Sequence, residues 1–403
     1  MAESLHTVTT LPTVRRPGCP FDPPTELLEA RRHGPLSHYT FPGGKPGWLV
    51  TGYDLVRSVL ADPRFSARKE LMLHPTIDYG DIELSPAPPG EFLFMDEPRH
   101  GRYRKPLTGK FTARRIRLLA ERLQEITEEQ LDAMEKTGPP VDLVTAFAKR
   151  VPAITMGEIL GVPHEDRDTF QELVDAFRNM EAPRDDLRAA YTATQEHLAE
   201  LVAAKRAHPT DDVLSDLTGS DLTDEELVGV ALILLAAGFD TTMHMLALGT
   251  FALLRNPDQL AALRDDPDLT DRAVEELLRY LSVGKTFMRT ALEDVELGGR
   301  TIEAGQPLIL SYNTANRDPE RYAEPHVLDL QRKGGGHLAF GHGIHQCLGQ
   351  QLARVQLRVA FPALLNRFPT LRLAVPAEEI VLRPEVDIAD VHGVKSLPVA
   401  WDT

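Results

Sequence analysis

The sequence predicts a mainly α fold with a small β portion. Apolar residues recur at helical spacing in several long segments, whereas patterns typical of strands are confined to short runs. One stretch around residue 235 is apolar on every side, which indicates a helix buried in the core. No low-complexity linker or internal repeat divides the 403 residues. We therefore expect one domain over residues 1–403, with residues 1–18 as a flexible lead-in.

The helices can be placed by their periodicity and by the residues at their ends. Four amphipathic segments are expected to be helical, namely residues 121–135, 168–180, 185–206 and 350–367. The long buried helix begins at a capping box formed by Thr223 and Glu226, and it ends at Arg255, just before Asn256-Pro257. At about 1.5 Å per residue, this helix is long enough to cross a whole domain.

Strand signals are short and scattered. Candidate strands cover residues 47–51, 294–297, 308–311 and 399–401. The second of them leads into a hairpin turn at Gly298-Gly299. The Pro-rich stretch 73–90 has no periodic pattern, and so long a loop inside a compact domain indicates a binding loop.

Charge and composition exclude several classes of partner and compartment. A formal net charge of −16 disfavours nucleic acid and anionic membranes as partners, because both would repel the chain. The longest strongly apolar stretch, residues 228–239, is shorter than the roughly 20 residues of a membrane span. The two cysteines, Cys19 and Cys347, do not form a disulfide framework pattern. A cytoplasmic location is therefore expected.

Glycines surround one of these cysteines. Gly341 and Gly343 precede Cys347, Gly349 follows it, and the helix expected over residues 350–367 begins directly afterwards. Backbone N–H groups and the helix dipole at such a position favour a thiolate. From these residues alone, an inert core cysteine or a nucleophile stays possible. Zinc is disfavoured, because no second cysteine or paired histidines lie nearby.

The segment around Cys347 reads FGHGIHQCLG from Phe340 to Gly349. It resembles the haem-binding signature of the cytochrome P-450 family, and the resemblance extends over nearly the whole chain. It implies the P-450 fold, with haem b between the long central helix and the helix after Cys347, which is the metal ligand. The residues that the resemblance assigns to the cofactor are His100, Arg104, Arg289, Phe340, Gly341, His345, Cys347 and Gly349.

A second family motif, E-x-x-R, is matched by Glu276 and Arg279. From its spacing alone this could be an i,i+3 surface ion pair on a helix. The resemblance instead implies a buried structural pair, which relatives complete with a further basic residue. In this sequence Val327 occupies the place of that residue, and His326 is the candidate substitute.

The middle of the long helix contains an acid beside an alcohol, Asp240 and Thr241. Buried acids and hydroxyls are costly unless they are hydrogen-bonded or functional. A core threonine bonded to its own helix is the alternative from the helix alone. The resemblance implies catalytic roles, with Thr241 steadying dioxygen and water in an oxygen-activating kink and Asp240 relaying protons. Thr242 is taken as structural.

A run of basic residues without any acid lies between Arg99 and Arg117. A solvated helix face is one interpretation. The other is a docking surface for an acidic ferredoxin, which with ferredoxin reductase would supply electrons. The residues assigned to this basic patch are Arg102, Lys105, Lys110, Arg114, Arg115, Arg354 and Arg358.

The function that the resemblance implies is monooxygenation, by hydroxylation or epoxidation, of a bulky and mostly apolar secondary metabolite such as a polyketide, macrolide or terpenoid. The residues expected to line the substrate pocket are Phe94, Leu232, Leu235, Ala236, Val283, Phe287 and His392. Two alternatives are a haem-thiolate peroxygenase that uses H2O2 and a non-catalytic haem-binding protein. The intact Asp240-Thr241 pair disfavours both.

Overall fold

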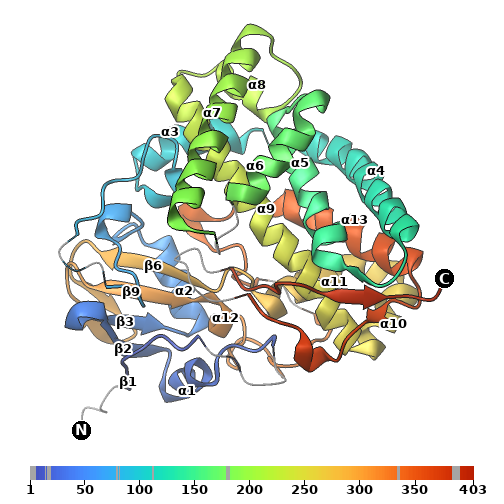
Figure 1. The fold of residues 1–403 in the computed structure, drawn as a ribbon. Coiled ribbons are helices and arrows are strands. Elements are labelled where there is room, and N and C mark those ends of the chain that lie inside the picture. Colours follow the sequence, from blue (N-terminus) through green and yellow to red (C-terminus); the bar gives the residue numbers. More distant parts are fainter. Residues whose placement is uncertain are drawn as a thin grey trace.

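The structure is a computed structural model, which describes residues 6–13, 15, 20–78, 80, 82–110, 113–177, 182–333, 336–383 and 391–403. Helices fill most of the molecule, and a six-stranded sheet lies to one side of them (Figure 1). The predicted fold class, mainly α with a small β portion, is confirmed.

Helix α9 (Asp224–Arg255) runs through the middle of the helical part (Figure 1). The Thr223 hydroxyl accepts the N–H of Glu226, and the Glu226 carboxylate accepts the N–H of Thr223, which confirms the predicted capping box. By length and apolarity alone α9 could cross a membrane, but 61% of its most apolar window is buried inside the protein. The helices that pack on it most extensively are α5 (Arg150–Leu160), α7 (Arg184–Ala207) and α13 (Gln350–Arg367). It is therefore a core helix.

The other predicted helices are also confirmed. They correspond to α4, α6, α7 and α13, although residues 178–180 of the second prediction lie outside the described residues. Of these, α4 is Ala113–Thr137 and α6 is Arg167–Phe177. The remaining helices are α1 (Thr25–His33), α2 (Tyr53–Ala61), α3 (Arg99–Thr108), α8 (Val213–Thr218), α10 (Pro257–Asp265), α11 (Thr270–Leu281) and α12 (Tyr312–Ala315).

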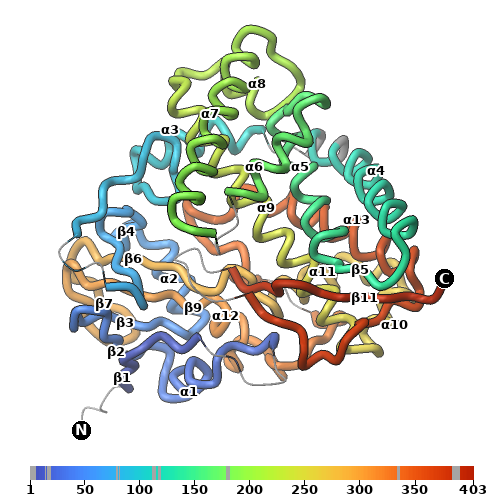
Figure 2. The backbone as a smooth tube through the Cα atoms, in the orientation of Figure 1, coloured from blue at the N-terminus to red at the C-terminus, as the bar shows by residue number. Residues whose placement is uncertain are grey.

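The largest sheet has the strand order β1-β2-β3-β9-β6-β4. Its strands are β1 (Thr7–Val8), β2 (Leu36–Phe41), β3 (Lys45–Val50), β4 (Phe65–Ser66), β6 (Thr286–Ala291) and β9 (Pro307–Ser311). A hairpin joins β7 (Val295–Leu297) to β8 (Arg300–Ile302), and β11 (Pro398–Ala400) pairs with β5 (Val141–Asp142) and β10 (Arg372–Leu373), as Figure 2 shows for β5. The four predicted strands are present as β3, β7, β9 and β11.

The lead-in predicted for residues 1–18 is wrong for the part that the structure describes. Thr7 and Val8 pair in parallel with His38 and Tyr39 of β2. Leu11 is buried in a small apolar cluster beneath the sheet. A strand of two residues is too short to give a periodic signal, so sequence patterning missed it.

The loop over residues 73–90 contains no helix or strand among its described residues, as predicted. Its end lies directly against α9. A Cβ atom on Gly229 would stand 2.0 Å from the Pro89 carbonyl oxygen, and one on Gly90 would stand 2.5 Å from the Glu226 carbonyl oxygen. The absence of side chains at both glycines therefore lets the loop and α9 meet backbone to backbone.

Candidate active site

The loop before α13 holds Cys347 in a tight turn. The Cys347 N–H donates to the Phe340 carbonyl at 2.8 Å. Gly341 and Gly343 have left-handed backbone conformations, with φ of 66° and 72°, that favour glycine. A Cβ atom on Gly343 would also stand 2.2 Å from the Leu60 carbonyl oxygen of α2. The predicted need for glycines around Cys347 thus has a steric cause.

The electrostatic surroundings of the thiol have opposing effects. Burial raises the pKa of Cys347, whereas the Gly349 N–H and the cations of Arg104 and Arg354 act to lower it. Arg104 is fixed to this loop, because its Nη2 donates to the Gln346 carbonyl at 2.6 Å. The helix-terminus effect predicted from sequence is therefore present, but burial opposes it.

Four basic side chains gather beside the Cys347 loop. They are His100, Arg104, Arg289 and His345, from α3, β6 and the loop itself. The rings of His100 and His345 lie 4.4 Å apart. Burial first, and then the charges of Arg289, His100 and Arg104, lower the pKa of His345 to about 3. Burial also lowers the pKa of His100 and of Arg289. The surroundings thus favour the neutral form of His345, and an anion bound here would raise the pKa of these basic groups.

The polar atoms of this cluster fit the two propionates of haem. Both ring nitrogens of His100 and Nδ1 of His345 are buried without a hydrogen-bond partner. Within the described part of the chain, Arg104 and Arg289 form no ion pair with a carboxylate. A Cβ atom on Gly349 would meet nothing within 4 Å, which leaves open space at the start of α13. The residues present therefore suit a flat, dianionic prosthetic group.

One face of α9 is accessible in the middle of an otherwise buried helix. Ala237 is exposed, and Ile233, Ala236 and Thr241 are half-buried. These residues follow one another at helical spacing, on the same side of α9. Leu232 and Leu235, which we predicted to line the substrate pocket, are instead buried in the core at 4% and 0% exposure. At 100° per residue, both lie on the side of α9 opposite Ala237.

The acid and the alcohol on α9 have different partners. The Thr241 hydroxyl donates to the Ala237 carbonyl one turn earlier, at 2.8 Å. Asp240 is buried, and its carboxylate pairs with Arg383 at 3.0 Å. Helix α9 continues from residue 224 to 255, so the kink expected at these residues does not interrupt it.

The other predicted pocket residues divide into accessible and buried ones. Phe94 is half-buried, and Phe287 is 43% exposed and stacked on Tyr312 at 4.6 Å. Val283 and His392 are buried instead, and the Nε2 atom of His392 lies 2.9 Å from the Pro20 carbonyl. Neither side chain is accessible in this structure, and Pro20 lies against the His392 ring.

The predicted pair Glu276–Arg279 is buried and bidentate, with N–O distances of 2.7 and 2.8 Å. The basic residue that completes it is Arg332, whose Nε lies 3.1 Å from Glu276 Oε1. Neither candidate from sequence takes this role. Val327 supplies only its carbonyl, which accepts from Arg279 and Arg332, and His326 lies beside Arg317 instead.

Sequence analysis missed Arg332 and a second pair next to the motif. Glu275 binds Arg354 through two hydrogen bonds of 2.6 and 3.0 Å and contacts His337 at 3.2 Å. The Arg354 guanidinium also lies over the ring of Phe340, 4.5 Å from its centroid. The sequence signal for this second pair was the two consecutive acids Glu275 and Glu276 on α11. Adjacent side chains on a helix point in different directions, so each acid meets a different partner.

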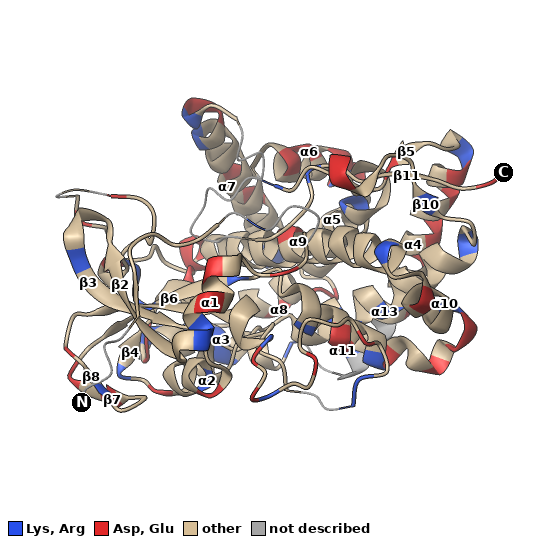
Figure 3. Ribbon diagram, turned by 90° about the horizontal axis from the view of Figure 1, so that it is seen from below, with Lys and Arg blue, Asp and Glu red and all other residues tan. Residues whose placement is uncertain are grey.

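The predicted basic patch is mostly neutralised by acids that are distant in the sequence. The ion pairs are Arg102–Glu226, Lys110–Asp216, Arg115–Asp211, Arg354–Glu275 and Arg358–Asp271, with N–O distances from 2.6 to 3.7 Å. Figure 3 correspondingly shows basic and acidic segments mixed around α11 and α13. Lys105 is exposed and has no ion pair within the described chain. The side chain of Arg114 lies outside the described residues.

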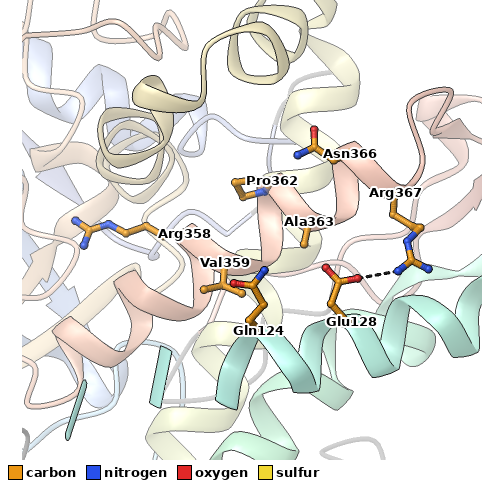
Figure 4. Close-up of a pocket in the computed structure, with 8 residues that line it drawn as sticks. All are labelled: Gln124, Glu128, Arg358, Val359, Pro362, Ala363, Asn366 and Arg367. Atoms are coloured by element: carbon orange, nitrogen blue, oxygen red, sulfur yellow. Dashed lines mark hydrogen bonds and ion pairs between the residues drawn. The ribbon is translucent and has the colours of Figure 1, made fainter. Parts of the chain in front are cut away.

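A groove of about 520 Å³ lies between α4 and α13, away from the Cys347 loop. Arg358 and Arg367 mark its two ends in Figure 4. Arg367 is bound by Glu128, Asp132 and Glu135 of α4 at 2.6 to 2.9 Å. The groove is therefore bordered by ion pairs that connect α13 to α4.

Comparisons with known proteins place the chain among relatives that match nearly its whole length. A family model described as cytochrome P-450 matches residues 188–380. The chain is 48% identical to cytochrome P-450 105C1 of a Streptomyces species over 386 residues, covering 94% of this chain and 96% of that protein. It is 40% identical to pentalenic acid synthase of Streptomyces avermitilis over 389 residues, covering 95% of each. The solved structure of CYP105P1 in complex with filipin I matches with a TM-score of 0.88 and 41% identity, covering 98% of this chain and 99% of that one.

The fold and these relatives define a haem-dependent monooxygenase that acts on small molecules. The chain belongs to the cytochrome P-450 family, and within it to the CYP105 family of actinobacterial natural-product monooxygenases.

Proposed function

We propose that Cys347 is the iron ligand and that the basic cluster of His100, Arg104, Arg289 and His345 binds the haem propionates. The observation that carries this assignment is the cluster itself, four buried or half-buried basic groups beside Cys347 with polar atoms left unpaired. Phe340, Gly341 and Gly349 would shape the loop around the sulfur.

The reaction that we propose is insertion of one oxygen atom of O2, by hydroxylation or epoxidation, into a bulky and mostly apolar secondary metabolite. The second oxygen atom leaves as water, which takes two electrons and two protons. The haem, when bound, supplies the oxygen-activating chemistry. The accessible face of α9 around Ala237 would position the substrate, together with Phe94, Ala236 and Phe287.

The protein's own contribution to the chemistry would be proton control. Asp240 is a buried acid next to Thr241, and Thr241 carries a hydroxyl on the accessible face of α9. Asp240 would take up a proton and release it toward the site, and the Thr241 hydroxyl would hold the water that receives it. Its present bond to the Ala237 carbonyl orients that hydroxyl.

The electron donor that we propose is an acidic ferredoxin, reduced by ferredoxin reductase in the cytoplasm. Most cations of the basic patch pair with acids of the same chain. Among the described side chains of the patch, Lys105 is exposed and forms no ion pair. Association of the two proteins would then depend on few charges and on short-range contacts.

A spectral titration with polyketides, macrolides, terpenoids and fatty acids tests the substrate class. A substrate that displaces the water on ferric iron shifts the Soret band to shorter wavelength, and one class should do so saturably and yield an oxygenated product with ferredoxin and NAD(P)H. A shift only with fatty acids would overturn the proposed class. Product formed as fast from H2O2 as from ferredoxin would favour a peroxygenase instead.

A further inference from the structure

The acid of the acid–alcohol pair, Asp240, lies in a largely buried cluster with two further polar side chains. Asp240 and His244 stand one turn apart on α9, and both are buried. Arg383 reaches them from near the C-terminus, with its Nη1 3.0 Å from Asp240 Oδ2 and 3.2 Å from His244 Nε2. Polar groups placed so deeply against a core helix require mutual hydrogen bonds or a function.

Hydrogen-bond chemistry fixes the roles within this cluster. A guanidinium has only donors, so Nε2 of His244 must accept from Arg383 and carry no proton. The 3.6 Å contact between His244 Nε2 and Asp240 Oδ1 then joins two acceptors, and it is not a hydrogen bond. Arg383 is therefore the group that holds the carboxylate and the imidazole together.

The C-terminal chain fixes Arg383 and the His244 ring at once. The Arg383 N–H donates to the Gly393 carbonyl at 2.9 Å, and a β-bridge joins the flanking residues Leu382 and Val394. A Cβ atom on Gly393 would stand 2.0 Å from Nδ1 of His244, so this glycine packs on the imidazole ring. The short backbone pairing around Arg383 and Gly393 thus positions the Arg383 guanidinium and limits the movement of the His244 ring.

Other basic groups surround the cluster on its inner side. Burial lowers the pKa of His392 most, and the charges of Arg15 and Lys285 lower it further. Among Asp240, His244 and Arg383, only the last has appreciable exposure, 19% of its side chain. Arg383 is therefore the solvent-facing member of this cluster.

We propose that Arg383 and His244 are positioning residues that hold the Asp240 carboxylate and control its proton transfer. The inference rests on the proposed function, which gives Asp240 the relay. The Asp240 carboxylate takes one proton from water at the Arg383 end, and the ion pair opens as its charge is lost. The acid releases that proton toward Thr241, and the carboxylate pairs with Arg383 again. One proton is moved, and every residue returns to its first state.

The first test compares Arg383→Met with Arg383→Lys in the haem-bound protein. Loss of the cation in Arg383→Met should lower product formed per NAD(P)H by about tenfold, a part of the roughly 10²–10⁴ that a positioned acid or base contributes. Arg383→Lys, which keeps a cation and a donor, should restore most of it. Equal coupling in wild type and Arg383→Met would overturn the proposal.

A double-mutant cycle tests the path through Gly393. The added methyl of Gly393→Ala should displace the His244 ring and reduce coupling, whereas His244→Ala combined with Gly393→Ala should behave as His244→Ala alone. Additive losses would contradict this path. The cycle also serves if Arg383→Met fails to bind haem.

A readout independent of turnover is the tautomer of His244. In 15N spectra of the reduced CO complex, assigned by difference with His244→Ala, wild type should carry the ring proton on Nδ1 and none on Nε2. Arg383→Lys should keep this signature and Arg383→Met should lose it. A proton on Nε2 in wild type would refute the arrangement.

Asp240→Asn separates this inference from the proposed function. If Asp240→Asn and Thr241→Ala both leave coupling unchanged, Asp240 is not the relay, and the proposed function and this inference fail together. If Asp240→Asn uncouples the enzyme while Arg383→Met does not, only the inference fails.

Discussion

At the residue scale, the buried network around Glu276 and Arg279 illustrates how a family motif fixes two members and leaves the third to the fold. The family pattern directed attention to Val327 and His326. The structure instead brings Arg332 to Glu276, where it also donates to three backbone carbonyls nearby. No local pattern could predict this contact, because 56 residues separate the partners.

Substitution of Arg332 tests this correction. Arg332→Met should lower the free energy of unfolding by about 2–4 kcal/mol, since it removes charge-assisted hydrogen bonds to a buried carboxylate. Val327→Ala, at a side chain 50% exposed, should change it by about 0.5 kcal/mol or less. Denaturant titration of both variants measures this, and equal losses would return the third role to residue 327.

Glu275 gives the molecule an acid-sensitive contact. Burial acts to raise its pKa, but hydrogen bonds from His337 and Arg354 outweigh burial and lower it to about 2. The unfolded value is about 4.3, so this contribution to stability is complete above about pH 5 and is lost as pH falls toward 2.

We therefore expect Glu275→Gln to lose less thermal stability than wild type between pH 5 and pH 3, while being less stable at pH 7. Glu378→Gln, at an exposed position, is the matched control and should follow wild type. Parallel melting curves for wild type and Glu275→Gln across this pH range would contradict the assignment.

At the element scale, long helices were predictable from sequence because periodicity and end signals agree over many residues. The capping box at Thr223 and the helix over residues 350–367 are examples. Strands of two residues, such as β1, carry too little pattern to be found. The orientation of α9 about its axis was also missed, because a helix apolar on all sides gives no sign of which face borders the site.

The contact between the 73–90 loop and α9 can be tested at Gly229. Although alanine favours helix over glycine by about 1 kcal/mol, Gly229→Ala would place a methyl 2.0 Å from the Pro89 carbonyl. We expect faster hydrogen exchange across residues 82–94 in this variant. Gly109→Ala, where a Cβ meets nothing within 4 Å, should leave exchange unchanged. Similar protection in both variants would contradict the close contact between the 73–90 loop and α9.

At the scale of the whole molecule, charge determines how a partner approaches. The net charge of −16 repels an acidic ferredoxin at long range, and internal ion pairs occupy most of the basic patch. The exposed Lys105 should then have a disproportionate effect on association.

Lys105→Glu should lower the ferredoxin-dependent rate several-fold at low salt, and the loss should shrink as ionic strength rises. Arg358→Glu, at a site already paired with Asp271, should have a smaller effect. Stopped-flow reduction over a range of salt concentrations measures both. A larger effect at Arg358 would place the docking surface elsewhere.

The most direct test of the central claim is the spectrum of the reduced carbon monoxide complex. Wild type and Cys19→Ser should both show the strongly red-shifted Soret band of a haem-thiolate protein, because Cys347 is the proposed ligand and lies beside the basic cluster. Cys347→Ser should lose that band. A Cys347→Ser protein that retained it would show that another residue holds the iron, and it would contradict the assignment of this site.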